Sequence, residues 1–86
     1  MHITEISAGQ SYACRFRLQT VLDEKGYPAN PSSPPVRFGT FESLGIIVKR
    51  DTEAELVELL DQHSKAKYIV PFSDIWDVDT IDWVSE

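Results

Sequence analysis

The sequence predicts a small, mainly β protein built on an antiparallel sheet. Polar and apolar residues alternate over residues 12–22, and a second run with strand character covers residues 38–50. A shorter run of the same kind, residues 67–70, ends at Pro71. Alternation with a period of two is typical of strands that have one buried face. A chain of 86 residues has the size of one domain, and we take residues 1–86 as that domain.

The first predicted strand is the clearest element of the sequence. Its charged residues, Arg15 and Arg17, occupy odd positions together with Gln19. A strand that is apolar on one side only favours an antiparallel sheet, because parallel sheets are usually covered on both faces. Its apolar side chains occupy even positions: Tyr12, Cys14, Phe16, Leu18 and Leu22.

A segment rich in proline and serine, residues 24–37, follows this strand and holds four of the five prolines. Proline has no backbone N–H, so this segment is excluded from the centre of a sheet and is predicted to be a surface loop. Residues 31–34 have the form of a P-x-x-P motif, which we interpret as part of a stiff connector. Strand character resumes at Phe38, and Gly39 and Gly45 indicate a bulge or bend in that second strand.

Two structures compete for residues 52–65. Residues 52–55 match the capping-box pattern, and Leu56, Leu59 and Leu60 then follow with helical spacing. These local signals favour a helix. The alternative is a strand over residues 55–60 between two tight turns.

The last part of the chain is predicted to contain two short strands separated by one turn. Residues 67–70 form the first strand, and Ser73 or Asp74 is placed to cap a single 3-10 turn after it. Residues 81–84 form the last strand. The apolar positions change from even to odd at Thr80, which indicates a bend or bulge there.

This closing segment resembles part of a known fold. Residues 68–76, Tyr-Ile-Val-Pro-Phe-Ser-Asp-Ile-Trp, followed by Ile-Asp-Trp at residues 81–83, resemble the closing strand, 3-10 turn and strand of an SH3-like small barrel. The resemblance implies a small antiparallel barrel with a C-terminal 3-10 turn. The chain is also similar to the small accessory proteins of bacteriophages. The capping box departs from the barrel pattern, and its helix would give an α+β fold, with one helix at 52–65 on an antiparallel sheet.

Charge is distributed unevenly along the chain. The net charge is −6, but the first fifty residues carry +2 and the remaining thirty-six carry −8. A net negative charge argues against a binder of nucleic-acid phosphates. No apolar run approaches the roughly 18–20 residues of a membrane span, and the N-terminus does not have the pattern of a signal peptide. We therefore expect a cytoplasmic protein, in the host cytoplasm if a phage encodes it.

The residue types that carry catalysis do not form a recognisable motif here. Cys14 and His63 are the only thiol–imidazole pair available, and Cys14 lies on the apolar face of its strand, where a thiol is inert. Asp74, Asp77 and Asp79, with Asp82, lack the glycine and the downstream glutamate of a calcium loop. We expect a protein that is not an enzyme and binds neither metal nor cofactor.

The two tryptophans are the best candidates for a binding site. Tryptophan is enriched in the energetically dominant parts of protein interfaces. The predicted partner-binding residues lie in the acidic final third: Trp76, Trp83, Asp74, Asp77 and Asp79. An aromatic anchor among acids suits a basic surface on a protein partner. We therefore expect a protein-interaction module, of the kind that a phage uses against a host protein.

A second hypothesis is a small barrel that binds nucleic acid. Arg15 and Arg17 share the polar side of the first strand, and small barrels bind nucleic acids through charge and aromatic stacking. The net negative charge argues against this alternative. A mimic of nucleic acid would need more carboxylates than the five that follow Tyr68. The residues of the alternative site are Arg15, Arg17, Arg37, Lys49 and Arg50.

Overall fold

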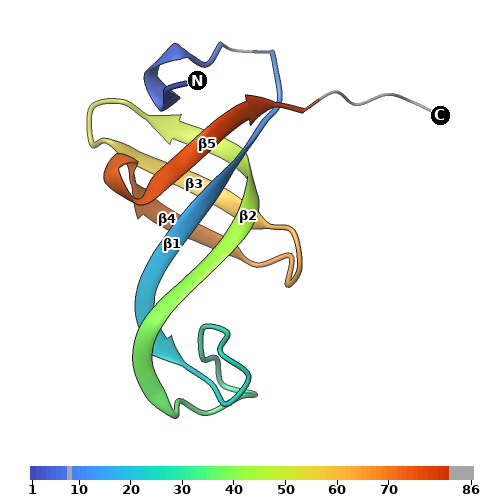
Figure 1. The fold of residues 1–86 in the computed structure, drawn as a ribbon, viewed down its shortest axis with the longest axis vertical. Helices are drawn as coiled ribbons and strands as arrows, with labels where there is room; N and C mark the ends of the chain where they lie inside the picture. The colour runs from blue at the N-terminus through green and yellow to red at the C-terminus, as the bar shows by residue number, and fades with distance from the viewer. Residues whose placement is uncertain (8, 82–86) are drawn as a thin grey trace, which may run out of the picture.

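The computed structural model describes residues 1–7 and 9–81 and shows one antiparallel sheet (Figure 1). The sheet has five strands in the order β4-β3-β2-β1-β5. Each consecutive pair from β1 to β4 is antiparallel, and β5 returns to pair with β1. The strands are β1 (Tyr12–Leu22), β2 (Arg37–Asp51), β3 (Leu56–Asp61), β4 (Lys67–Pro71) and β5 (Ile75–Thr80).

Two single 3-10 turns complete the secondary structure of the described residues. The first, η1 (Ile3–Glu5), precedes β1, and the second, η2 (Phe72–Asp74), joins β4 to β5. The prediction of a mainly β, antiparallel fold with a C-terminal 3-10 turn is therefore confirmed. The sheet is open, because β4 and β5 lie at opposite ends of the strand order. Closure into an SH3-like barrel thus stays a prediction.

The alternative α+β fold, with a helix at 52–65, is wrong. Residues 56–61 form β3, which is bonded to β2 on one side and to β4 on the other. Leu59 and Val57 are fully buried, whereas Leu56 lies on the outside. Pairing on both sides outweighs local helix propensity, which is worth only a few tenths of a kcal/mol per residue. The capping-box residues instead form a turn in which the carboxylate of Asp51 accepts a hydrogen bond from the N–H of Ala54.

The inner face of the sheet carries the hydrophobic core, and β1 supplies most of its centre. Side chains at even positions of β1 point inward, while Arg15 and Arg17 are exposed, as the alternation predicts. Phe16 packs against the rings of Phe41 and Tyr68, with centroids 6.1 and 6.0 Å away. The buried apolar residues are Ile3, Tyr12, Cys14, Phe16, Leu22, Phe41, Val57, Leu59, Val70 and Val78.

Strand β2 packs closely against the core at Gly45, because glycine has no side chain there. A Cβ atom at Gly45 would lie 3.1 Å from Cε1 of Phe16 and 3.3 Å from the carbonyl oxygen of Leu60. The expected bulge in β2 is found between Ile47 and Lys49, not at Gly39 or Gly45. Gly45 therefore permits a close approach to the core, and the irregularity lies a short distance beyond it.

The loop between β1 and β2 is held to the body of the protein at several points. The carboxylate of Asp23 accepts hydrogen bonds from the N–H groups of Lys25 (2.9 Å) and Tyr27 (3.0 Å). The ring of Tyr27 packs edge-on against Phe41, 5.7 Å between centroids. The loop lies at the end of the long β1–β2 ribbon, away from β5 (Figure 1). The predicted proline-rich segment is thus a loop, but an anchored one.

A buried carboxylate holds the turn between β3 and β4. Asp61 is 0% exposed and accepts hydrogen bonds from the hydroxyl of Ser43, from the N–H of Ser64 (2.9 Å) and from the hydroxyl of Ser64 (2.7 Å). Burial raises the pKa of Asp61, but the hydrogen bonds from Ser43 and Ser64 outweigh it and leave the pKa below its ordinary value. The carboxylate is therefore ionised, and the serines replace the water that it loses.

Removing this carboxylate should destabilise the protein in a pH-dependent way. Asp61→Asn loses charge-assisted hydrogen bonds in a buried site, so we expect it to lower the free energy of unfolding by about 2 kcal/mol at neutral pH. The folded-state pKa lies below the unfolded value of about 3.9, so the carboxylate gives its full stabilisation above about pH 4. This stabilisation disappears as the pH falls through the folded-state pKa. Urea unfolding at several pH values measures it.

The control for this experiment is Asp79→Asn, which changes an exposed carboxylate. It should shift the free energy of unfolding by less than about 0.5 kcal/mol at neutral pH. The difference between wild type and Asp61→Asn should shrink as the pH is lowered. A difference that is absent at neutral pH, or that stays constant in acid, would contradict this role of Asp61.

Candidate interaction face

The pairing of β5 with β1 builds the candidate site. Trp76 lies directly opposite Arg15, and Asp79 lies opposite Ala13. Two residues of β5 therefore face the single intervening residue of β1, which is the arrangement of a β-bulge. Asp77 has a positive φ of 54°, a conformation that residues other than glycine, asparagine and aspartate seldom adopt.

The bulge reverses the facing of the side chains that follow it. Val78 is buried in the core, while Trp76 is 38% exposed on the outer face. In a regular strand these two residues would point the same way, because they are two positions apart. A change of phase thus occurs at Asp77, and Thr80 continues the strand opposite Tyr12. The change predicted at Thr80 depends on residues 82–83, which are not among the described residues. The predicted last strand falls mostly on residues 82–84, outside the described residues.

The outer face here joins acidic and basic residues in ion pairs. Nε of Arg17 donates to Oδ1 of Asp74 at 3.0 Å, and Nε of Arg15 lies 3.8 Å from Oδ2 of Asp77. Both pairs are solvent-accessible, and pairs of this kind contribute about 0–1 kcal/mol each. Their effect is on charge, since each arginine offsets one aspartate. We call this group the Trp76 face: Arg15, Arg17, Asp74, Trp76 and Asp77.

Parts of the two contact areas that the sequence suggested therefore lie on one surface. Trp76, Asp74 and Asp77 from the predicted partner site lie among the arginines of the predicted nucleic-acid site. Asp79 is exposed nearby, and its carboxylate accepts a hydrogen bond from the N–H of Thr80 (2.8 Å). Trp83 lies outside the described residues. The basic first part and the acidic last part of the sequence thus meet on this surface, where their charges offset one another.

The other predicted basic residues do not join this face. Arg50 donates through Nη1 to the carbonyl oxygens of Ile3 (3.2 Å) and Ile6 (3.4 Å), so it holds the N-terminal turn. Lys49 lies opposite Glu58 of β3. Arg37 is at the far end of β2, opposite Leu22 of β1. The five basic residues of the alternative site are thus spread over three parts of the protein.

The only cysteine of the sequence is part of the hydrophobic core. Cys14 is fully buried, and burial raises the pKa of its thiol to about 12. His63 is exposed in the turn between β3 and β4. The thiol is neutral and shielded, so it has neither the charge nor the access of a nucleophile.

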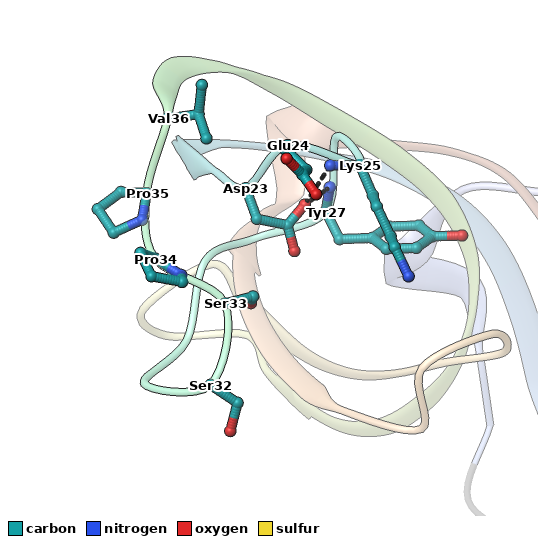
Figure 2. A pocket seen from close by; sticks show the side chains of 9 residues that line it. All are labelled: Asp23, Glu24, Lys25, Tyr27, Ser32, Ser33, Pro34, Pro35 and Val36. Carbon is teal, nitrogen blue, oxygen red and sulfur yellow. Dashed lines mark hydrogen bonds between the residues drawn. The ribbon is translucent and has the colours of Figure 1, made fainter.

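A hollow lies inside the β1–β2 loop, with a volume of about 640 Å³ (Figure 2). Burial raises the pKa of Asp23 on its wall, but hydrogen bonds from the N–H groups of Tyr27 and Lys25 lower it below its ordinary value. A carboxylate that holds its loop in this way is a poor general base. The rest of the lining consists of Tyr27, two serines, two prolines and Val36, with Glu24 and Lys25. This composition suits a structural hollow better than a reaction site.

Comparison with known protein families, curated proteins and solved structures found no match to this chain. Within residues 1–7 and 9–81, no three acidic, histidine or cysteine side chains gather in the manner of a metal site. The same residues contain no helix of the length and apolar character needed to cross a bilayer.

Sequence reasoning missed an apolar surface at the end of the β1–β2 ribbon. Val21 of β1 lies directly opposite Phe38 of β2, and Val36 precedes Phe38 by two residues. Phe38 is 69% exposed, and both valines are exposed as well. The odd position of Val21 among the polar residues of β1 was the available signal. We call Val21, Val36 and Phe38 the ribbon tip.

The positive φ at Asp77 gives a prediction about stability. Asp77→Val places a β-branched residue in the left-handed region, and we expect it to lower the free energy of unfolding by about 1–2 kcal/mol. Asp77→Gly fits that backbone and loses only an exposed ion pair, so it should stay within about 0.5 kcal/mol of wild type. Thermal or urea unfolding measures both variants.

Asp79→Val is the matched control, because it makes the same exchange two residues away outside the bulge. It should cost less than about 0.5 kcal/mol. If Asp77→Val and Asp79→Val were equally stable, the bulge would not be where the register places it.

Proposed function

We propose that this protein is a non-enzymatic interaction module that binds another protein through the Trp76 face. The observation that carries the proposal is the partly exposed Trp76, set opposite Arg15 on the outer face of the sheet. Tryptophan and arginine are the residue types most enriched where interfaces gain their binding energy. The β-bulge at Asp77 returns Val78 to the core while Trp76, which precedes it, stays on the outer face.

The charge pattern favours a different partner from the one the acidic sequence suggests. Asp74 and Asp77 are already paired with arginines, so the face offers alternating charges around an aromatic ring. Such a surface complements a partner that also carries both signs, and the charges select the orientation more than they add affinity. A purely basic partner would leave Arg15 and Arg17 facing like charge. An accessory role of the phage type is the biological setting that we propose for this binding.

The structural roles of one thiol and two carboxylates support the non-enzymatic part of the proposal. The thiol of Cys14 is buried, and the carboxylate of Asp61 is consumed by the β3–β4 turn. The carboxylate of Asp23 holds the loop that surrounds the hollow near Val36. Each of these groups is already used in packing or in hydrogen bonds that hold the fold, so it is not free to react with a substrate.

The test is recovery of a stoichiometric protein partner from the cytosol of the source cells with immobilised protein. Wild type should retain the partner, and Trp76→Ala should lose it, since removal of a central aromatic anchor costs about 2 kcal/mol or more. Ile69→Ala is the matched control, because Ile69 is also an exposed apolar residue but lies on β4, at the opposite edge of the sheet. Identical recovery with all three proteins, or no stoichiometric partner, would refute the proposal.

The nucleic-acid alternative makes a separate prediction. The net charge is −6, and the arginines of the Trp76 face are paired with aspartates. We therefore expect no retardation of single-stranded or double-stranded DNA in a gel shift, even at low ionic strength. A salt-sensitive shift that Arg15→Gln and Arg17→Gln abolish together would revive that alternative.

A further inference from the structure

The outer face of the β1–β2 ribbon is exposed from the row of Arg17 and Glu42 to the apolar ribbon tip. Phe38 is the most exposed large apolar side chain of the described residues, at 69%. A ring of this size in water costs free energy that burial would recover, at roughly 25 cal/mol per Å². Exposed apolar patches of this kind often mark interaction sites. The ribbon tip is therefore a candidate for contact with another protein surface.

The register of β1 and β2 gives this outer face an internal symmetry. Three successive outward rows pair Arg17 with Glu42, Gln19 with Thr40, and Val21 with Phe38. Each row joins two residues of matching chemistry: opposite charges, two uncharged polar groups, and two apolar groups. Each row therefore also matches the same row of a second copy when the two residues are in exchanged positions. A second copy rotated by half a turn about an axis parallel to the strands would present the same three matches.

We propose that the chain forms a weak two-fold dimer through the outer face of β1 and β2. In this dimer β1 of each copy lies over β2 of the other. Arg17 then faces Glu42 of the second copy, and Val21 faces Phe38 of the second copy, each contact occurring twice. Interfaces between identical chains are usually isologous in this way, with the same patch used on both sides.

The state of the two charged residues supports this arrangement. Glu42 is exposed, and among the described residues no cationic nitrogen lies within ion-pair distance of its carboxylate. Arg17 reaches Asp74 through Nε, and a guanidinium has further N–H donors at its far end. The carboxylate of Glu42 is thus available to a second copy, and the free end of Arg17 is available to receive it.

The size of the patch sets the strength of the dimer. Three rows of two strands cover an area near the low end of specific interfaces, below about 1,200 Å² in total. The net charge of −6 on each copy adds repulsion. We therefore expect a dissociation constant on the order of 100 μM at about 150 mM salt. The proposal goes beyond the binding of a different protein at the Trp76 face, with which it shares Arg17.

Sedimentation velocity over a concentration series, from about 10 μM to about 1 mM, tests the dimer. Wild type should shift from monomer to dimer across this range. Arg17→Glu and Glu42→Arg should each remain monomeric, because each places like charges opposite one another twice. Their equimolar mixture should form a dimer again, since Glu at position 17 then meets Arg at position 42 and the native pair forms on the other side. Circular dichroism of each variant verifies that it is folded.

The apolar half of the interface has its own variant and control. Phe38→Gln should weaken dimerisation by at least about tenfold, because two rings leave each dimer. Ile69→Gln makes a similar exchange at a residue that is 62% exposed on β4 and outside the contact, so it should dimerise like wild type. Monomer at every concentration, equal effects of these two variants, or failure of the charge-swapped mixture to dimerise would each overturn the proposal. Loss of partner binding in Trp76→Ala leaves these outcomes unchanged, so the two proposals fail separately.

Discussion

The structure depends on the alternation of β1 and on the pairing of its two edges. From Ala13 to Leu22 it pairs with β2 on one side, and β5 pairs with it on the other. Its alternation places Cys14 and Phe16 in the core and Arg15 and Arg17 in water. Since the register of β2 and β5 is fixed against these positions, β1 decides which residues of its neighbours are buried. A shift of one residue in either pairing would exchange the inner and outer faces, which the buried aromatic cluster forbids.

The bulge at Asp77 is the one departure from this regularity that matters for function. It lets Val78 enter the core while Trp76, one residue before the bulge, stays on the outer face, so β5 contributes to both the core and the surface. Without it the chain would place either a tryptophan and a valine inside or both outside. The positive φ at Asp77 is a small local cost, and it also directs the aspartate toward Arg15. An exposed aromatic ring among paired charges is the result.

The sequence predicted the strands and which side chains of β1 are buried, because alternation with a period of two follows the alternation of buried and exposed side chains. Only the alternative, a helix at 52–65, is wrong. The capping box and the leucine spacing that favoured it are local signals, while the strand at 56–61 is formed by its two neighbours. Sequence reasoning also treated the arginines and the aspartates as separate sites, because nothing within either segment shows that β5 returns to β1. The structural role of Asp61 was not predicted, since Ser43, whose hydroxyl donates to its carboxylate, lies on another strand. Long-range pairing accounts for each of these differences.

The most direct test of this account is the pattern of nuclear Overhauser effects between β1 and β5. The account predicts cross-strand backbone contacts of Arg15 with Trp76 and of Ala13 with Asp79, and contacts of the Val78 methyls with core aromatic protons. Backbone contacts of Ala13 with Val78, the neighbour expected in an unbulged strand, would contradict it. So would contacts of the Trp76 indole with the rings of Phe16 and Phe41, because they would place Trp76 inside the core.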